Sequence, residues 1–73
     1  MGSYNYKQLS KKLRKMGFHL YRQGKGSHVL WVNDETGAFV ALPNHGGKDI
    51  RRGTLRSIVK QIGLKSIDEL DRI

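Results

Sequence analysis

The chain contains no cysteine among its 73 residues. Without cysteine it can form neither a disulfide framework nor a thiolate metal site, so apolar packing must hold it together. This absence fits a reducing compartment, and we expect a cytoplasmic protein. No apolar run approaches the ~20 residues that span a bilayer, and no apolar segment follows the N-terminus as a secretion signal would. The sequence therefore predicts a soluble chain that has no membrane partner.

Acidic residues are scarce. Six Asp and Glu stand against fourteen Lys and Arg, which gives a net charge of +8 and a pI of about 10.2. Such an excess of positive charge favours a polyanionic partner, and nucleic acid is the leading interpretation. The alternatives are an acidic protein partner, or a positive charge that serves no polyanionic partner.

Grouped metal ligands are also missing from the sequence. The three histidines do not show a spacing such as H-x-x-x-H, and a carboxylate cluster that could hold Mg²⁺ is absent. We therefore expect no metal and no cofactor, which argues against a metal-dependent nuclease. The acidic residues are scattered along the chain: Asp34, Glu35, Asp49, Asp68, Glu69 and Asp71.

The length predicts a single domain over residues 1–73, since a chain this short buries only about 60% of its unfolded surface. Its first patterned segment, residues 5–16, is predicted to be an amphipathic helix with a basic outer face. Asn5 or Ser3 can cap its start, and Gly17 follows its end. Its apolar positions recur at spacings of four and three: Leu9, Leu13 and Met16.

Three strands are predicted next, over residues 18–23, 27–33 and 38–42, and Pro43 stops the third. The first turn, 24–26, leaves the register open. A three-residue turn places Arg22 opposite His28 and aligns Phe18 and Leu20 with Val32 and Leu30. A two-residue turn exchanges the two faces.

Residues 43–48 are rich in helix and strand breakers and predict a loop that delivers His45 and Lys48 near the end of the third strand. A second helix should follow, with Asp49 as its N-cap and Gly63 after its end. Residues 66–69, Ser-Ile-Asp-Glu, resemble a capping box that opens a short last helix. The second helix has one apolar face, formed by Leu55, Ile58, Val59 and Ile62.

This order predicts an α+β fold, α-β-β-β-α, with a three-stranded antiparallel sheet covered by two helices on one face. It is the layout of a double-stranded RNA-binding domain.

Three motifs carry a more specific resemblance. They are Gly26-Ser27-His28, the corner Pro43-Asn44-His45 with its Gly-Gly-Lys loop, and residues 53–64. Together they resemble the HicA family of mRNA-interferase toxins, in order from about Leu9 to Leu70. The resemblance implies a toxin that cleaves mRNA without a metal and thereby inhibits translation, with His28 at the catalytic position and a HicB-type antitoxin as partner.

The residues can support this chemistry. RNA carries its own nucleophile, the 2′-OH, so an imidazole can remove that proton while cations stabilise the charge on the phosphorane. His28 is the expected base, and Lys25, Lys48 or Arg51 could stabilise charge. His45 either protonates the leaving oxygen or braces its loop, and His19 is expected to be structural. The predicted RNA-binding residues are Lys25, Ser27, His45, Lys48, Arg51, Arg52 and Arg56.

Two other functions fit the composition: a noncatalytic double-stranded RNA-binding module, and a basic adaptor for a protein. Tyr21, Trp31 and Phe39 could stack on RNA bases. Packing in the core is the more conservative expectation for Trp31 and Phe39.

Overall fold

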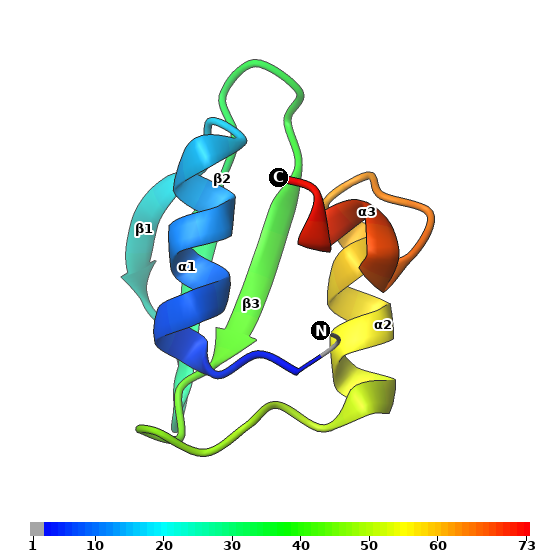
Figure 1. Cartoon of the computed structure of the whole chain (residues 1–73). Coiled ribbons are helices and arrows are strands. Elements are labelled where there is room, and N and C mark those ends of the chain that lie inside the picture. Colours follow the sequence, from blue (N-terminus) through cyan, green and yellow to red (C-terminus); the bar gives the residue numbers. More distant parts are fainter. Residues whose placement is uncertain (1–2) are drawn as a thin grey trace.

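The computed structural model describes residues 3–73; Met1 and Gly2, which the predicted domain includes, lie outside the described residues. The order of elements confirms the predicted α-β-β-β-α core and the predicted short last helix after it (Figure 1). The elements are α1 (Tyr6–Lys15), β1 (His19–Gln23), β2 (His28–Val32), β3 (Phe39–Pro43), α2 (Arg52–Gln61) and α3 (Ile67–Asp71).

Helix α1 is fixed at both ends by local signals. At its start the Asn5 side chain accepts a hydrogen bond from the backbone N–H of Gln8, and the Gln8 side chain accepts one from the backbone N–H of Asn5. This is the reciprocal capping box. At its end Gly17 has a φ of 98°, and the N–H groups of Gly17 and Phe18 bond to the carbonyls of Arg14 and Leu13. Gly17 therefore ends the helix as predicted.

The start of α2 differs from the prediction. The helix begins at Arg52, and its N-cap residue Arg51 makes no side-chain capping bond. Asp49, the predicted cap, instead forms an antiparallel bridge with Asn5, and the N–H of Ile50 bonds to the carbonyl of Tyr4 at 2.7 Å. This pairing with the N-terminal segment holds Asp49 in extended backbone, away from the helix start. The predicted cap was wrong for that reason.

Ser66 caps the start of α3 as predicted, because its Oγ accepts from the N–H of Glu69. The Glu69 carboxylate reaches back to the N–H of Lys65, one residue before the position that a capping box uses.

The sheet has the order β1-β2-β3, and both pairs are antiparallel. Neither register considered from the sequence is correct. Arg22 faces Leu30, and Leu20 faces Trp31, with a bulge between Leu20 and Arg22. The hairpin closes through the N–H of Gly24 and the carbonyl of His28 at 2.9 Å, so the three-residue turn lies one position later than expected.

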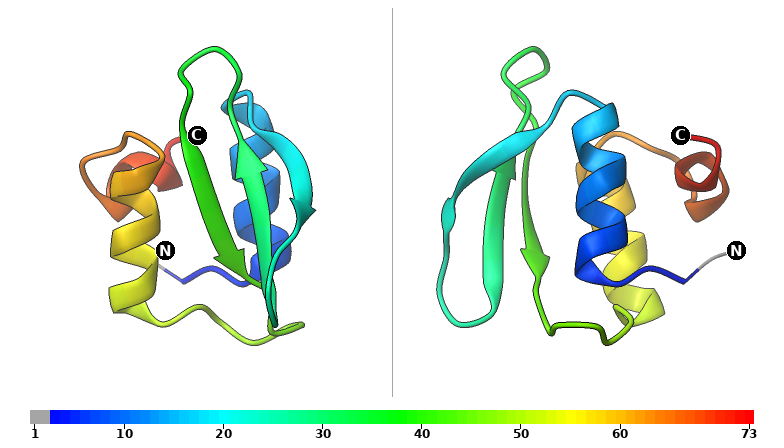
Figure 2. Two further views of the ribbon diagram at one scale, coloured as in Figure 1. Left: turned by 180° about the vertical axis from the view of Figure 1, so that it is seen from behind. Right: turned by 60° about the vertical axis from the view of Figure 1, so that its left-hand side comes forward.

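Both long helices lie on one side of the sheet, α1 over β1 and β2 and α2 beside β3 (Figures 1 and 2). The side chains of alternate residues on β2 and β3 face these helices and are buried: Val29, Trp31, Val40 and Leu42. Seen from behind, no helix of the described chain covers the other face (Figure 2). Trp31 therefore belongs to the core as expected. Phe39 remains 49% exposed, and the expectation that it packs in the core was wrong.

The C-terminal helix is tied to the start of the chain. Tyr4 Oη donates to the Asp71 carboxylate, and Lys12 Nζ donates to the carbonyl of Ile73 at 2.7 Å. Leu70 and Ile67 are buried in the same core as the sheet and α2. None of the helices within residues 3–73 combines the length and apolar character that a membrane span requires.

Candidate functional site

The candidate site is a cleft of about 590 Å³ where the ends of β2 and β3 meet the start of α2. Four of the predicted site residues line it: His28, His45, Lys48 and Arg51. They come from a strand, a loop and a helix cap, and so from segments that are separated along the sequence. Pro43, Asp49, Ile50 and Thr54 complete the lining.

His28 is the first residue of β2 and pairs with Pro43, the last residue of β3. Its carbonyl is held by two hydrogen bonds, one from the N–H of Gly24 at 2.9 Å and one from Gln23 Nε2 at 3.2 Å. Its side chain is exposed, and no other described side chain bonds to its ring. A fixed backbone and an accessible ring suit a group that must meet a ligand.

The loop that carries His45 is braced by another residue. Asn44 Oδ1 accepts from the N–H of Gly46 at 3.2 Å, and the N–H of Asn44 bonds to the carbonyl of Ser27 at 2.8 Å. These bonds tie the loop to the hairpin before β2. The bracing role considered for His45 is thus performed by Asn44, while the His45 side chain lies exposed on the cleft.

His19 has a different environment. Its Nε2 lies 3.0 Å from Asp34 Oδ2, and its Nδ1 lies 3.3 Å from the carbonyl oxygen of Leu20. The ring links β1 to the β2–β3 turn, which agrees with its expected structural role.

The remaining predicted residues lie outside the cleft lining. Lys25 and Ser27 belong to the hairpin turn that leads into His28, where the N–H of His28 bonds to the carbonyl of Lys25 at 3.1 Å. Arg52 and Arg56 lie on α2 and line a second groove of about 240 Å³ between α2 and α3. Lys60 and Lys65 line this groove too, so Arg52, Arg56 and Lys60 of α2 all lie on it, while Arg51, the N-cap residue, lines the cleft.

Sequence reasoning missed Asp49 and Thr54 as parts of the cleft. Asp49 was assigned to a helix cap, and Thr54 carries no signal beyond its place in the first turn of α2. The uncapped start of α2 is a second feature of the site that the sequence did not reveal. Because Arg51 offers no capping acceptor, the free N–H groups of the first turn remain open to an anion.

The fold and the cleft together define a small, basic α+β domain that presents two histidines and two cations on a concave surface, an arrangement suited to a phosphate ester. Comparison with known proteins gives the family. A family model described as the HicA toxin of bacterial toxin-antitoxin systems matches residues 6–64. A relative from Pseudomonas fluorescens (strain Pf0-1), named probable mRNA interferase HicA, is 38% identical over 61 residues, which cover 82% of this chain and 95% of that protein.

The chain therefore belongs to the HicA toxin family, and the resemblance stated from its motifs is confirmed. No solved structure matches it. Its likeness to a double-stranded RNA-binding domain accordingly stays a prediction.

Proposed function

We propose that this chain is a metal-independent endoribonuclease that cleaves mRNA with His28 as the general base. Membership of a toxin family and the name of the Pseudomonas relative support the class of activity. The observation that carries the proposal is the cleft itself, in which His28, His45, Lys48 and Arg51 meet from separate elements. Local folding alone does not require these four side chains to meet.

In the proposed reaction the ring of His28 takes the proton of the ribose 2′-OH. The 2′-oxygen forms a bond to the adjacent phosphorus, and the bond from phosphorus to the 5′-oxygen breaks. His45 donates a proton to that leaving oxygen. The products are a 2′,3′-cyclic phosphate and a 5′-hydroxyl, so atoms and charge balance without any further reactant.

The positive groups of the cleft would stabilise the transition state. Lys48 and Arg51, which line the cleft, would meet the charge that develops on the phosphorane oxygens. The uncapped first turn of α2 adds free backbone N–H groups at the same end of the cleft. Lys25 and Ser27 in the hairpin, and Arg52 and Arg56 on α2, would hold the neighbouring backbone of the RNA.

We also propose that a HicB-type antitoxin neutralises the chain by covering His28. An acidic contact surface would complement the charge of +8. A complex in which His28 stays open while cleavage is inhibited would reject this occlusion.

The test of the proposed function compares the wild type, His28→Ala and His19→Ala on single-stranded RNA in EDTA. His19 is the matched control, because it is a second exposed histidine that pairs with Asp34 outside the cleft. We expect His28→Ala to lose ~10²-fold or more in rate, the usual contribution of a positioned general base. His19→Ala should stay close to the wild type.

Two further readouts define the chemistry. Cleaved ends should carry 2′,3′-cyclic phosphate or its hydrolysis product, and a 2′-deoxy substitution at the scissile nucleotide should abolish cleavage. A folded His28→Ala protein that cleaves at the wild-type rate removes His28 from the mechanism. A chain that binds RNA but leaves it intact supports the noncatalytic double-stranded RNA-binding module instead.

A further inference from the structure

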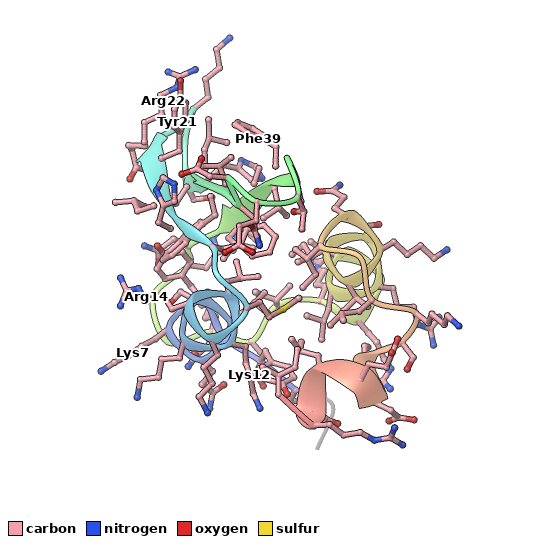
Figure 3. The ribbon with its side chains drawn as sticks, turned by 90° about the horizontal axis from the view of Figure 1, so that it is seen from above. Lys7, Lys12, Arg14, Tyr21, Arg22 and Phe39 are labelled. Atoms are coloured by element: carbon pink, nitrogen blue, oxygen red, sulfur yellow. The ribbon has the colours of Figure 1, made fainter. Side chains whose placement is uncertain are left out.

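The face of the sheet that no described helix covers carries two exposed aromatic side chains. Tyr21 is 58% exposed and Phe39 49%, and their rings meet edge to face with centroids 5.9 Å apart. Figure 3 shows them, with Arg22, on the opposite side of the strands from α1. Two large aromatic rings in contact on an uncovered face form an exposed apolar patch, which is a candidate interaction surface.

This surface is continuous with the candidate cleft. Side chains alternate between the two faces of a strand, and the observed register places His28, Leu30 and Val32 on the face that carries Phe39. His28 and Phe39 lie at opposite ends of the β2–β3 ladder, since His28 pairs with Pro43 and Val32 pairs with Phe39. Four residues of strand separate them, or about 13 Å at ~3.3 Å per residue. That length corresponds to about four stacked nucleotides at ~3.4 Å each.

The chemistry of this face fits single-stranded RNA. Base–aromatic stacking tolerates any base, because every base has a π-face, and it needs aromatic side chains that are exposed, as Tyr21 and Phe39 are. Arg22 lies next to Tyr21 on β1 and supplies a cation for the backbone, within a chain of charge +8. In a duplex the bases are already stacked on each other, so a double strand would gain little from these rings.

We propose that Tyr21 and Phe39 form a stacking subsite for bases of single-stranded RNA, about four nucleotides from the bond that His28 cleaves. This inference rests on the proposed function, and it deepens that function by assigning a single-stranded substrate. The cleft would position the scissile phosphate while the aromatic pair holds the strand farther along. The subsite also gives the enzyme a way to favour unpaired regions of an mRNA.

The test measures binding without cleavage. The probe is a fluorescein-labelled oligoadenylate of twelve nucleotides with 2′-O-methyl riboses, which lack the nucleophile. Fluorescence anisotropy then gives Kd for the wild type, Tyr21→Ala, Phe39→Ala and Leu20→Ala. Leu20 is the matched control, because it is 52% exposed on the same strand but pairs with Trp31 on the opposite face.

We expect Tyr21→Ala and Phe39→Ala each to weaken binding on the order of 10-fold, as stacking contacts do. The slope of log K against log salt should not change, because no phosphate contact is lost. Tyr21→Phe and Phe39→Tyr should bind like the wild type, since both keep a ring, and Leu20→Ala should stay within about twofold. The same probe annealed to its complement should show no difference between the aromatic variants and the wild type.

Several results would overturn the subsite. Unchanged affinity in Tyr21→Ala and Phe39→Ala would remove both rings from RNA binding, and an equal loss in Leu20→Ala would show a general effect on β1. A dimer that Phe39→Ala dissociates, with RNA affinity unchanged, would assign the face to a second copy of this chain. Failure of the catalytic proposal would appear separately, as cleavage that persists in His28→Ala, and would leave these affinities as they are.

Discussion

Neutralising the arginines at the start of α2 tests the RNA footprint most directly. Arg51 lines the His28 cleft, whereas Arg52 and Arg56 line the groove between α2 and α3. All three side chains are exposed, so replacing them with Ala should leave the fold intact. We expect the triple variant to bind single-stranded RNA more weakly and with a shallower salt dependence.

The magnitude follows from counterion release. Each phosphate contact on a single strand contributes about 0.7 to the slope of log K against log salt, so three lost contacts should flatten the slope by about 2. Between about 50 and 200 mM salt one contact changes affinity by roughly 2.6-fold, and three change it by roughly 20-fold. The wild type should therefore lose its advantage over the variant as salt rises.

The assay is a salt titration of Kd with an uncleavable 2′-O-methyl oligonucleotide. The matched control neutralises three exposed lysines along one side of α1 at i, i+4 and i+8: Lys7, Lys11 and Lys15. Both variants change the net charge equally. If the α1 variant flattens the slope as much as the α2 variant, the slope reports overall charge and our placement of the footprint is refuted.

Replacing Arg51 should affect the cleavage kinetics differently from replacing Arg52 or Arg56. Arg51→Ala should lower kcat, because that side chain lines the cleft, while Arg52→Ala and Arg56→Ala should act mainly on KM. Equal losses of kcat in all three single variants would show that the two surfaces act as one site.

Three predictions concern stability. Asn33→Ala should destabilise the fold by about 2 kcal/mol in urea unfolding, because it removes three part-buried hydrogen bonds, including one from Nδ2 to the carbonyl of Met16 at 3.1 Å; a change below about 0.5 kcal/mol would contradict this. Gly53→Ala should stabilise by about 0.4–1 kcal/mol, because a Cβ at this helical position meets nothing within 4 Å, and a lower Tm would show that the backbone needs glycine there. Burial and the bond to Asp71 raise the pKa of Tyr4 to about 12 from its ordinary 10.0. The stability that protonated Tyr4 gives the folded state is therefore complete below pH 10 and is lost as the pH rises to about 12. The tyrosinate absorbance of wild type minus Tyr4→Phe should show that late titration, and a midpoint near the ordinary 10.0 would mean that neither burial nor the bond to Asp71 acts on Tyr4 in solution.

The same contact predicts an acid limit. The hydrogen bond from Tyr4 holds the pKa of Asp71 below its ordinary value of 3.8. A depressed carboxyl pKa contributes stability above the unfolded value and loses it as the pH falls. Thermal unfolding below about pH 4 should therefore separate wild type from Tyr4→Phe less than it does at neutral pH.

The helices could be predicted because their signals are local. The Asn5 box, the apolar spacing of Leu9 and Leu13, and the glycines that end α1 and α2 each act within one or two turns. The strands were predicted to within about one residue for the same reason. Family membership also lay within the sequence, because its motifs keep their order along the chain.

Other features depended on distant contacts. The sequence predicted Asp49 as a helix cap. In the structure Asp49 instead forms an antiparallel bridge with Asn5, which is more than forty residues away. The hairpin register depended on a bulge after Leu20, which alternation alone does not reveal. Phe39 was expected in the core, but the helices cover only one face of the sheet. Side chains alternate between the two faces along β3, and this alternation places the Phe39 ring on the uncovered face.

The sequence by itself determined the positions of the helices and strands, the charge of +8 and the identity of the candidate base, since each is carried by residues close together in the chain. The tertiary structure decided which face of the sheet is buried, which cations share the cleft with His28, and that Tyr21 and Phe39 lie exposed on the face that His28 also occupies. The physical reason is that register, sheet coverage and cleft lining are set by contacts between segments far apart in sequence, and local propensity does not contain them.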